Sequence, residues 1–169
     1  MPMELSAISG LWPLVKRLPS FMLRWYFTKE RLAEFVYLDL YPRNESAVVN
    51  LGSDASFRLH LQLINLSPFR LELDRANFRF SCGSVVLKAA VLERRSFAAG
   101  EIASIFLEES MSDGQANQVA SHFVNNPVGL DGNIEFNCEI HPFQKPIRQL
   151  TGIQAKLVNA NFRQVPINA

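Results

Sequence analysis

Apolar residues recur at helical spacing near the start of the chain. Projected at about 100° per residue, several of them share one arc while Lys16, Arg17 and Arg24 fall opposite. The residues of the apolar arc are Leu11, Leu14, Val15, Leu18, Met22 and Trp25. Pro13 suits the first turn of a helix, whereas Pro19 would kink or split one. The pattern therefore predicts two short helices or one bent helix before residue 33.

From residue 34 onward, apolar and polar residues alternate as they do in half-buried strands. The clearest case is SFRLHLQLIN, residues 56–65, which places its phenylalanine and leucines inward and Arg58, His60 and Gln62 outward. Further strands are predicted at 34–42, 69–82, 85–92, 101–109, 132–142 and 152–162. A break or bulge is expected at 74–77, and turns are expected at 82–84, 98–100 and 131–132.

The helical spacing returns once, in residues 112–126. Ser112 or Asp113 would cap this helix, and Asn125-Asn126-Pro127 would end it. Its buried face would consist of Ala116, Val119, Ala120 and Phe123. Residues 143–150 would form at most an edge segment, because Pro146 cannot sit in a central strand.

About seven short strands separated by regular turns indicate a mainly β fold. We predict an antiparallel, immunoglobulin-like β-sandwich with one late helix, plus an N-terminal amphipathic helical extension. The expected division is an extension at 1–33 and a β-sandwich domain at 34–169.

Positive charge is concentrated at the N-terminal end. The 169-residue chain has a net charge of +1, but residues 1–31 hold five basic and two acidic side chains. The remainder holds 12 basic and 14 acidic side chains, so the predicted domain lacks the basic face that nucleic-acid binding requires. No nucleic-acid partner is expected.

Cys82 and Cys138 are the only cysteines, and each lies in an alternating apolar row. Two buried thiols are the simpler interpretation, and a bridge between strands is the alternative. The first residues lack a secretory signal, because Glu4 comes early and basic residues interrupt the apolar run. No charge-free run near the start approaches the ~20 residues of a membrane span. We therefore expect a cytoplasmic location, with peripheral association at the inner face of a membrane.

The stretch LQLINLSPFRLELDRANFRFSCGS resembles the late embryogenesis abundant (LEA) group 2 family, also called the water-stress and hypersensitive-response domain. The family turn joins two strands, and Asn65, Ser67, Pro68 and Phe69 occupy its motif positions here. The resemblance extends over roughly residues 47–164 and implies a non-catalytic binding or protective role, associated with desiccation and stress tolerance. Many members of the family carry a membrane span before the domain, whereas this chain has an amphipathic cationic segment.

Catalytic chemistry finds little support in the sequence. His60, His122 and His141 are far apart and lack metal-ligand spacing, and Glu108 and Glu109 would face opposite sides of a strand. No enzyme activity, metal or cofactor is expected. The remaining basic residues are interpreted as edge or surface charges that discourage aggregation, with anion binding as the alternative. They are Arg70, Arg75, Arg79, Arg94 and Arg95.

The N-terminal segment carries the strongest functional pattern. Its candidate contact residues are Leu11, Trp12, Leu14, Val15, Lys16, Arg17, Leu18, Phe21, Met22, Arg24, Trp25 and Tyr26. They could lie on an anionic membrane surface, dock on a protein partner or a second copy of the chain, or fold back and complete the core of the sandwich. Because Trp12, Leu23 and Phe27 fall off the main arc, contact on more than one side of the helix is expected.

Overall fold

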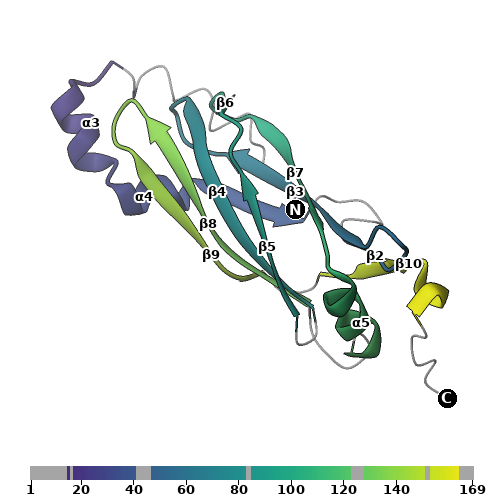
Figure 1. The fold of residues 1–169 in the computed structure, drawn as a ribbon. Helices are drawn as coiled ribbons and strands as arrows, with labels where there is room; N and C mark the ends of the chain where they lie inside the picture. Colours follow the sequence, from purple (N-terminus) through teal and green to yellow (C-terminus); the bar gives the residue numbers. More distant parts are fainter. Residues whose placement is uncertain are drawn as a thin grey trace.

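The computed structural model describes residues 15, 17–40, 47–82, 85–122, 128–150 and 153–163. Within these ranges two β-sheets pack face to face and enclose one hydrophobic core (Figure 1). The prediction of a β-sandwich with one late helix is confirmed.

The first sheet is built around β3 (Ser56–Asn65). β1 (Val36–Leu40) and β2 (Ala47–Asn50) both pair with one edge of β3, and β7 (Ile102–Ser110) pairs with the other. β10 (Ala155–Val158) joins β2 in parallel, whereas every other pairing described is antiparallel.

The second sheet is built around β4 (Leu71–Cys82). β5 (Val85–Val91) and β6 (Arg95–Phe97) share one edge of β4, and β8 (Val128–Cys138) lies along the other. β9 (Phe143–Leu150) pairs with β8 and forms the outer edge, the position that Pro146 requires.

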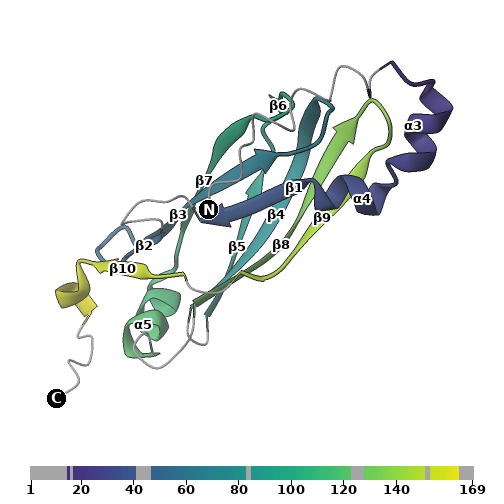
Figure 2. The ribbon, with the colours of Figure 1, turned by 180° about the vertical axis from the view of Figure 1, so that it is seen from behind.

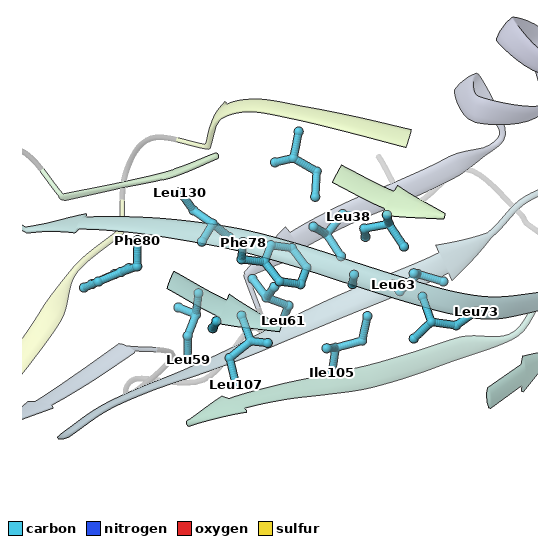
Figure 3. Packing of buried hydrophobic residues seen from close by; sticks show 14 of the residues in the cluster. Leu38, Leu59, Leu61, Leu63, Leu73, Phe78, Phe80, Ile105, Leu107 and Leu130 are labelled. Atoms are coloured by element: carbon cyan, nitrogen blue, oxygen red, sulfur yellow. The ribbon is translucent and has the colours of Figure 1, made fainter. Parts of the chain in front are cut away.

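The core lies between the sheets and follows the alternation in the sequence. In β3 the side chains of Phe57, Leu59, Leu61 and Leu63 are fully buried, while Arg58 and His60 are exposed. Figure 3 shows leucines of β3 facing Phe78, Phe80 and Leu130 of the opposite sheet. Phe57 stacks on Phe80 with ring centroids 4.9 Å apart.

Two expectations about strands need correction. The described residues form ten strands rather than about seven, because β2 and β6 are too short for their alternation to be recognised. The predicted turn at Asp131-Gly132 is wrong, because both residues lie inside β8. A Cβ on Gly132 would come within 2.6 Å of the Asn77 carbonyl oxygen, so this glycine permits close strand approach instead of a turn.

The bulge expected after Leu73 is present as a register shift between β4 and β8.

The late helix, α5 (Asp113–His122), buries Ala116, Val119 and Ala120. Ser112 caps it, since its hydroxyl accepts a hydrogen bond from the Gln115 backbone N–H at 3.3 Å. Phe123 and the Asn125–Pro127 stop lie outside the described residues. Close to α5, the short 3₁₀ helix η2 (Ala160–Arg163) ends in a buried Arg163 side chain that pairs with Asp113 at 2.5 Å.

Between Pro19 and β1, where every residue is described, the chain forms α3 (Ser20–Tyr26) and α4 (Lys29–Glu34). Pro19 is the residue directly before α3, and the break between the two helices falls at Phe27-Thr28. Val15 is helical and a turn at Arg17-Leu18 precedes Pro19, so the helical pattern is interrupted at this proline, as the sequence predicts, and α3 begins directly after it. α3 lies at one end of the sandwich, whereas α5 lies at the other end (Figures 1 and 2).

Candidate interaction site on helix α3

One side of α3 is anchored to the sandwich. Leu23 and the following Phe27 are 7 % and 3 % exposed and belong to the same core as the sheets. The Phe27 ring lies edge-on to the Phe69 ring with centroids 4.9 Å apart, and it also meets Phe35 at 6.0 Å. This anchor orients α3, because burying an aromatic side chain stabilises its position by about 1.5–3 kcal/mol.

α4 fixes the same end of the molecule. The Thr28 hydroxyl caps it by accepting from the Arg31 N–H at 3.4 Å, and Leu32 is fully buried. At its C-terminal end the Ala33 carbonyl accepts a hydrogen bond from the Lys145 ammonium at 2.8 Å. Burial lowers the pKa of Lys145, while the charge of the nearby Glu34 opposes that shift. α4 is thus held against β1 and β9.

The opposite side of α3 is apolar and exposed. Trp25 is 82 % exposed and Phe21, one helical turn earlier, is 71 % exposed. Leu18, Met22 and Tyr26 are also exposed and complete this set, which we call the α3 face. Five neighbouring apolar side chains thus form an exposed apolar patch, a feature typical of interaction surfaces.

Exposed basic residues lie in the same N-terminal segment as the α3 face. Arg17, Arg24, Lys29 and Arg31 are exposed, against two acidic residues, Glu30 and Glu34, in the same segment. The Arg31 guanidinium lies 4.8 Å from the Tyr26 ring centroid and donates to the Tyr26 carbonyl at 2.9 Å. His141 Nε2–H donates to the Arg24 carbonyl across 3.4 Å.

The candidate contact residues divide into three groups. Leu11, Trp12, Leu14 and Lys16 lie outside the described residues. Val15 packs against the core and is half-buried. Arg17, Leu18, Phe21, Met22, Arg24, Trp25 and Tyr26 are all exposed on or beside α3.

The sequence pattern did not single out the anchor residues. In the sequence pattern, Leu23 and Phe27 fall off the main apolar arc and indicate only that the helix has contacts on more than one side. In the structure, these two residues pack on the sandwich. The arc residues Leu18, Met22 and Trp25 face solvent instead. Both sides of a short helix are apolar here, so periodicity alone cannot say which side faces its own domain.

The turn motif at residues 65–69 contacts the α3 anchor, because its Phe69 packs against Phe27. The buried Asn65 side chain donates to the carbonyls of Phe69 and Ala98, each at 2.9 Å, and accepts from the Ser67 hydroxyl at 2.7 Å. Pro68 and Phe69 are buried at the tip of the turn. Asn65 therefore fixes the position of Phe69, and the Phe69 ring packs against the Phe27 ring.

The two cysteines are free. Cys82 pairs with Val128 at one end of β4, and Cys138 pairs with Leu71 at the other end. They are separated by the length of that strand, roughly 36 Å at 3.3 Å per residue, which excludes a bridge between them. Burial raises the pKa of Cys82 to about 11 and also raises the pKa of the half-buried Cys138.

The three histidines remain dispersed. His60 is on the outer face of β3 with its ring 4.7 Å from Phe106, and His122 bonds locally at the end of α5. Glu108 forms an exposed ion pair with Arg58 at 2.7 Å. Among the described residues, no group of three or more His, Cys, Asp or Glu side chains could hold a metal ion. No helix in the same ranges combines the length and the apolarity that crossing a membrane would take.

The sequence matches no family model and no curated protein. Solved structures with a similar arrangement include a candidate ApaA protein from Bordetella pertussis, with 13 % identity and a TM-score of 0.42 over 68 % of this chain and 85 % of that one. Another is the solution structure of a candidate LEA protein, with 8 % identity and a TM-score of 0.49 over 94 % of this chain and 92 % of that one. These likenesses concern the fold alone.

Proposed function

We propose that this chain is a non-catalytic peripheral membrane protein of the group 2 LEA type, which lies on an anionic membrane surface through the α3 face. The observation that carries the proposal is the exposure of Phe21 and Trp25 on the side of α3 opposite its anchor. The membrane would be the inner, cytoplasmic face, where anionic lipids are concentrated.

The composition of the α3 face supports a lipid surface. Aromatic side chains favour the membrane interface, and each large apolar side chain that enters it contributes about 1.5–3 kcal/mol. Each nearby Lys or Arg adds on the order of 1 kcal/mol on anionic lipid. Together the exposed apolar residues and the four exposed cations of the segment would be enough for reversible attachment without a span.

The group 2 relationship rests on the turn at Asn65. The side-chain bonds of Asn65 and Ser67 give the motif residues a definite structural task, which supports the resemblance found in the sequence. A protective role in stress follows from that resemblance. Attachment by an amphipathic helix would replace the span that many members of the family carry.

A protein partner is the second candidate for the same surface. Tryptophan, tyrosine and arginine dominate binding hot spots, and Trp25, Tyr26 and Arg24 are exposed together. In this case the chain would be a subunit that docks on a larger assembly or on a second copy through α3.

Vesicle binding distinguishes the two candidates. We expect the full chain to sediment with vesicles containing phosphatidylserine, and to do so less at high salt. Replacing Phe21 and Trp25 together by serine should weaken the binding at least 100-fold, because each replacement removes about 1.5–3 kcal/mol. Phe162→Ser is the matched control, since Phe162 is 63 % exposed in η2, which packs beside α5 and away from α3.

Point variants are preferable to removal of residues 1–31, because Leu23 and Phe27 are part of the core. Trp25 emission should shift to shorter wavelength on vesicles in a Trp12→Phe background, which leaves Trp25 as the single tryptophan. If vesicles do not bind, and if the double variant instead abolishes a dimer or larger complex seen by sedimentation velocity, the membrane proposal is wrong.

A further inference from the structure

The outer face of the second sheet carries a groove of about 580 Å³ near the middle of β4. Three basic side chains line it, Arg79 from β4, Lys88 from β5 and Arg148 from β9. Asn77 and Asn133 also line it and offer amide groups. The acidic lining residues are Asp131 and Glu109, so the cations are in excess.

The register of the sheet brings two of these cations together. Arg79 lies directly opposite Lys88 on one side and opposite Asp131 on the other. Like charges opposite each other in a sheet are unfavourable. β4 is an internal strand, so of the two roles expected for Arg79 that of an edge charge does not apply, and Arg79 is an exposed charge on the surface of the sheet.

Among the described residues, the three groove cations belong to a set of basic side chains without a partner, which also includes Arg70 and Arg75 outside the groove. Within the described ranges, Arg79, Lys88 and Arg148 take part in no ion pair or side-chain hydrogen bond. By contrast, Arg58 pairs with Glu108 and Arg94 pairs with Asp74. Unpaired donors that surround one groove are available to an anion.

A strained bulge positions the third cation. The pairing of β8 with β9 moves from Leu130↔Leu150 to Gly132↔Ile147, so Arg148 and Gln149 both lie opposite Asp131. Gln149 has a φ of 47°, and its N–H donates to the Asp131 carboxylate at 2.9 Å. Bulges redirect neighbouring side chains, and a non-glycine residue at positive φ persists only where surrounding contacts hold it. Here the Asp131 carboxylate supplies such a contact beside the groove.

We propose that this groove binds a phosphate-bearing anion of small-molecule size. Two guanidinium groups can each present two parallel N–H donors to phosphate oxygens, and the Lys88 ammonium adds a mobile third cation. The volume is in the range of small-ligand sites. The site is independent of the α3 face, because its lining comes from strands of the second sheet and from Glu109 of β7, and not from the N-terminal helices.

Titration of the full chain with inorganic phosphate and with pyrophosphate, at ionic strength held constant with chloride, tests the proposal. We expect saturable shifts of the Arg79 and Arg148 Nε–H signals in NMR spectra and a rise in melting temperature that follows the same dissociation constant. Arg79→Gln and Arg148→Gln should each weaken binding at least tenfold. Arg75→Gln, an exposed change on the same strand outside the groove, should leave binding unchanged.

Stability without ligand separates a binding role from a structural one. Arg79→Gln should leave the melting temperature of the ligand-free protein unchanged or raise it, because it removes a like charge opposite Lys88. Vesicles containing phosphatidic acid distinguish the two sources of the phosphate. If Arg79→Gln weakens vesicle binding while the α3 face is intact, the groove binds a lipid headgroup. If Arg79→Gln does not weaken vesicle binding, the groove binds a free molecule. No saturable binding of either soluble anion or of these vesicles, or equal binding by wild type and Arg79→Gln, would overturn the proposal.

Discussion

Asn65 determines the path of the chain between β3 and β4. Its side-chain amide donates to the Phe69 and Ala98 carbonyls, and its oxygen accepts from both the backbone N–H and the hydroxyl of Ser67. All of this occurs at a position with no exposed surface. A buried polar network of this kind stabilises only while every member is satisfied.

Asn65→Ala should therefore be strongly destabilising. The change leaves buried carbonyl and N–H groups unpaired at about 1–3 kcal/mol each, so we expect a loss of about 3 kcal/mol in the free energy of unfolding. Urea denaturation measures this loss, and Asn77→Ala, an exposed asparagine on β4, is the matched control. A loss within about 0.5 kcal/mol, as for an ordinary surface change, would show that Asn65 does not stabilise the turn.

The thiol of Cys82 predicts a dependence of stability on alkaline pH. Burial raises its pKa to about 11, whereas an unfolded cysteine titrates near about 8.5. The raised pKa means that the folded state favours the neutral thiol. Its contribution to stability is complete below the unfolded pKa and is lost as the pH rises toward about 11.

Cys82→Ala should consequently show a smaller fall in the free energy of unfolding between pH about 8 and about 10 than the wild-type chain shows. Urea denaturation at the two pH values measures the difference. Parallel falls in the two proteins would mean that other groups cause the alkaline destabilisation.

At the scale of elements, the sequence was informative where a strand is long and buried on one face. The alternation in residues 56–65 leads directly to β3, because a slip of one residue would expose its leucines. β2 and β6 are too short for such a signal. Gly132 was misread because the glycine that permits close approach to Asn77 looks, in sequence, like the glycine of a turn.

The orientation of α3 could not be predicted for a different reason. Its two apolar sides differ only in their long-range partners, and the partner of Phe27 is Phe69, more than forty positions away in the chain. The composition of the α3 face could therefore be predicted from the sequence, whereas its exposure to solvent could be determined only from the folded structure.

A matched pair of phenylalanines tests the two sides of α3. Phe27→Ala should cost about 3–5 kcal/mol of unfolding free energy and speed hydrogen exchange in α3, because it removes the ring packed on Phe69. Phe21→Ala should change the unfolding free energy by no more than about 0.5 kcal/mol, because that side chain is exposed. Equal losses for the two variants would contradict the assignment of anchor and exposed face.

At the scale of the whole molecule, the position of α3 sets how the protein would sit on a membrane. α3 occupies one end of the elongated sandwich, and α5 with η2 occupies the other (Figures 1 and 2). An attachment confined to α3 would leave the far end in solvent, because the sandwich between the two ends is a single packed core.

This geometry predicts where a bound vesicle gives protection. Hydrogen exchange of the full chain with and without phosphatidylserine vesicles should slow at residues 17–27 and remain unchanged in α5 and η2. A spin-labelled lipid headgroup should likewise broaden the NMR signals of α3 before those of Arg163. Protection spread over the outer face of either sheet would instead mean that the protein lies on its side, and the α3 face would then be one contact among several rather than the attachment point.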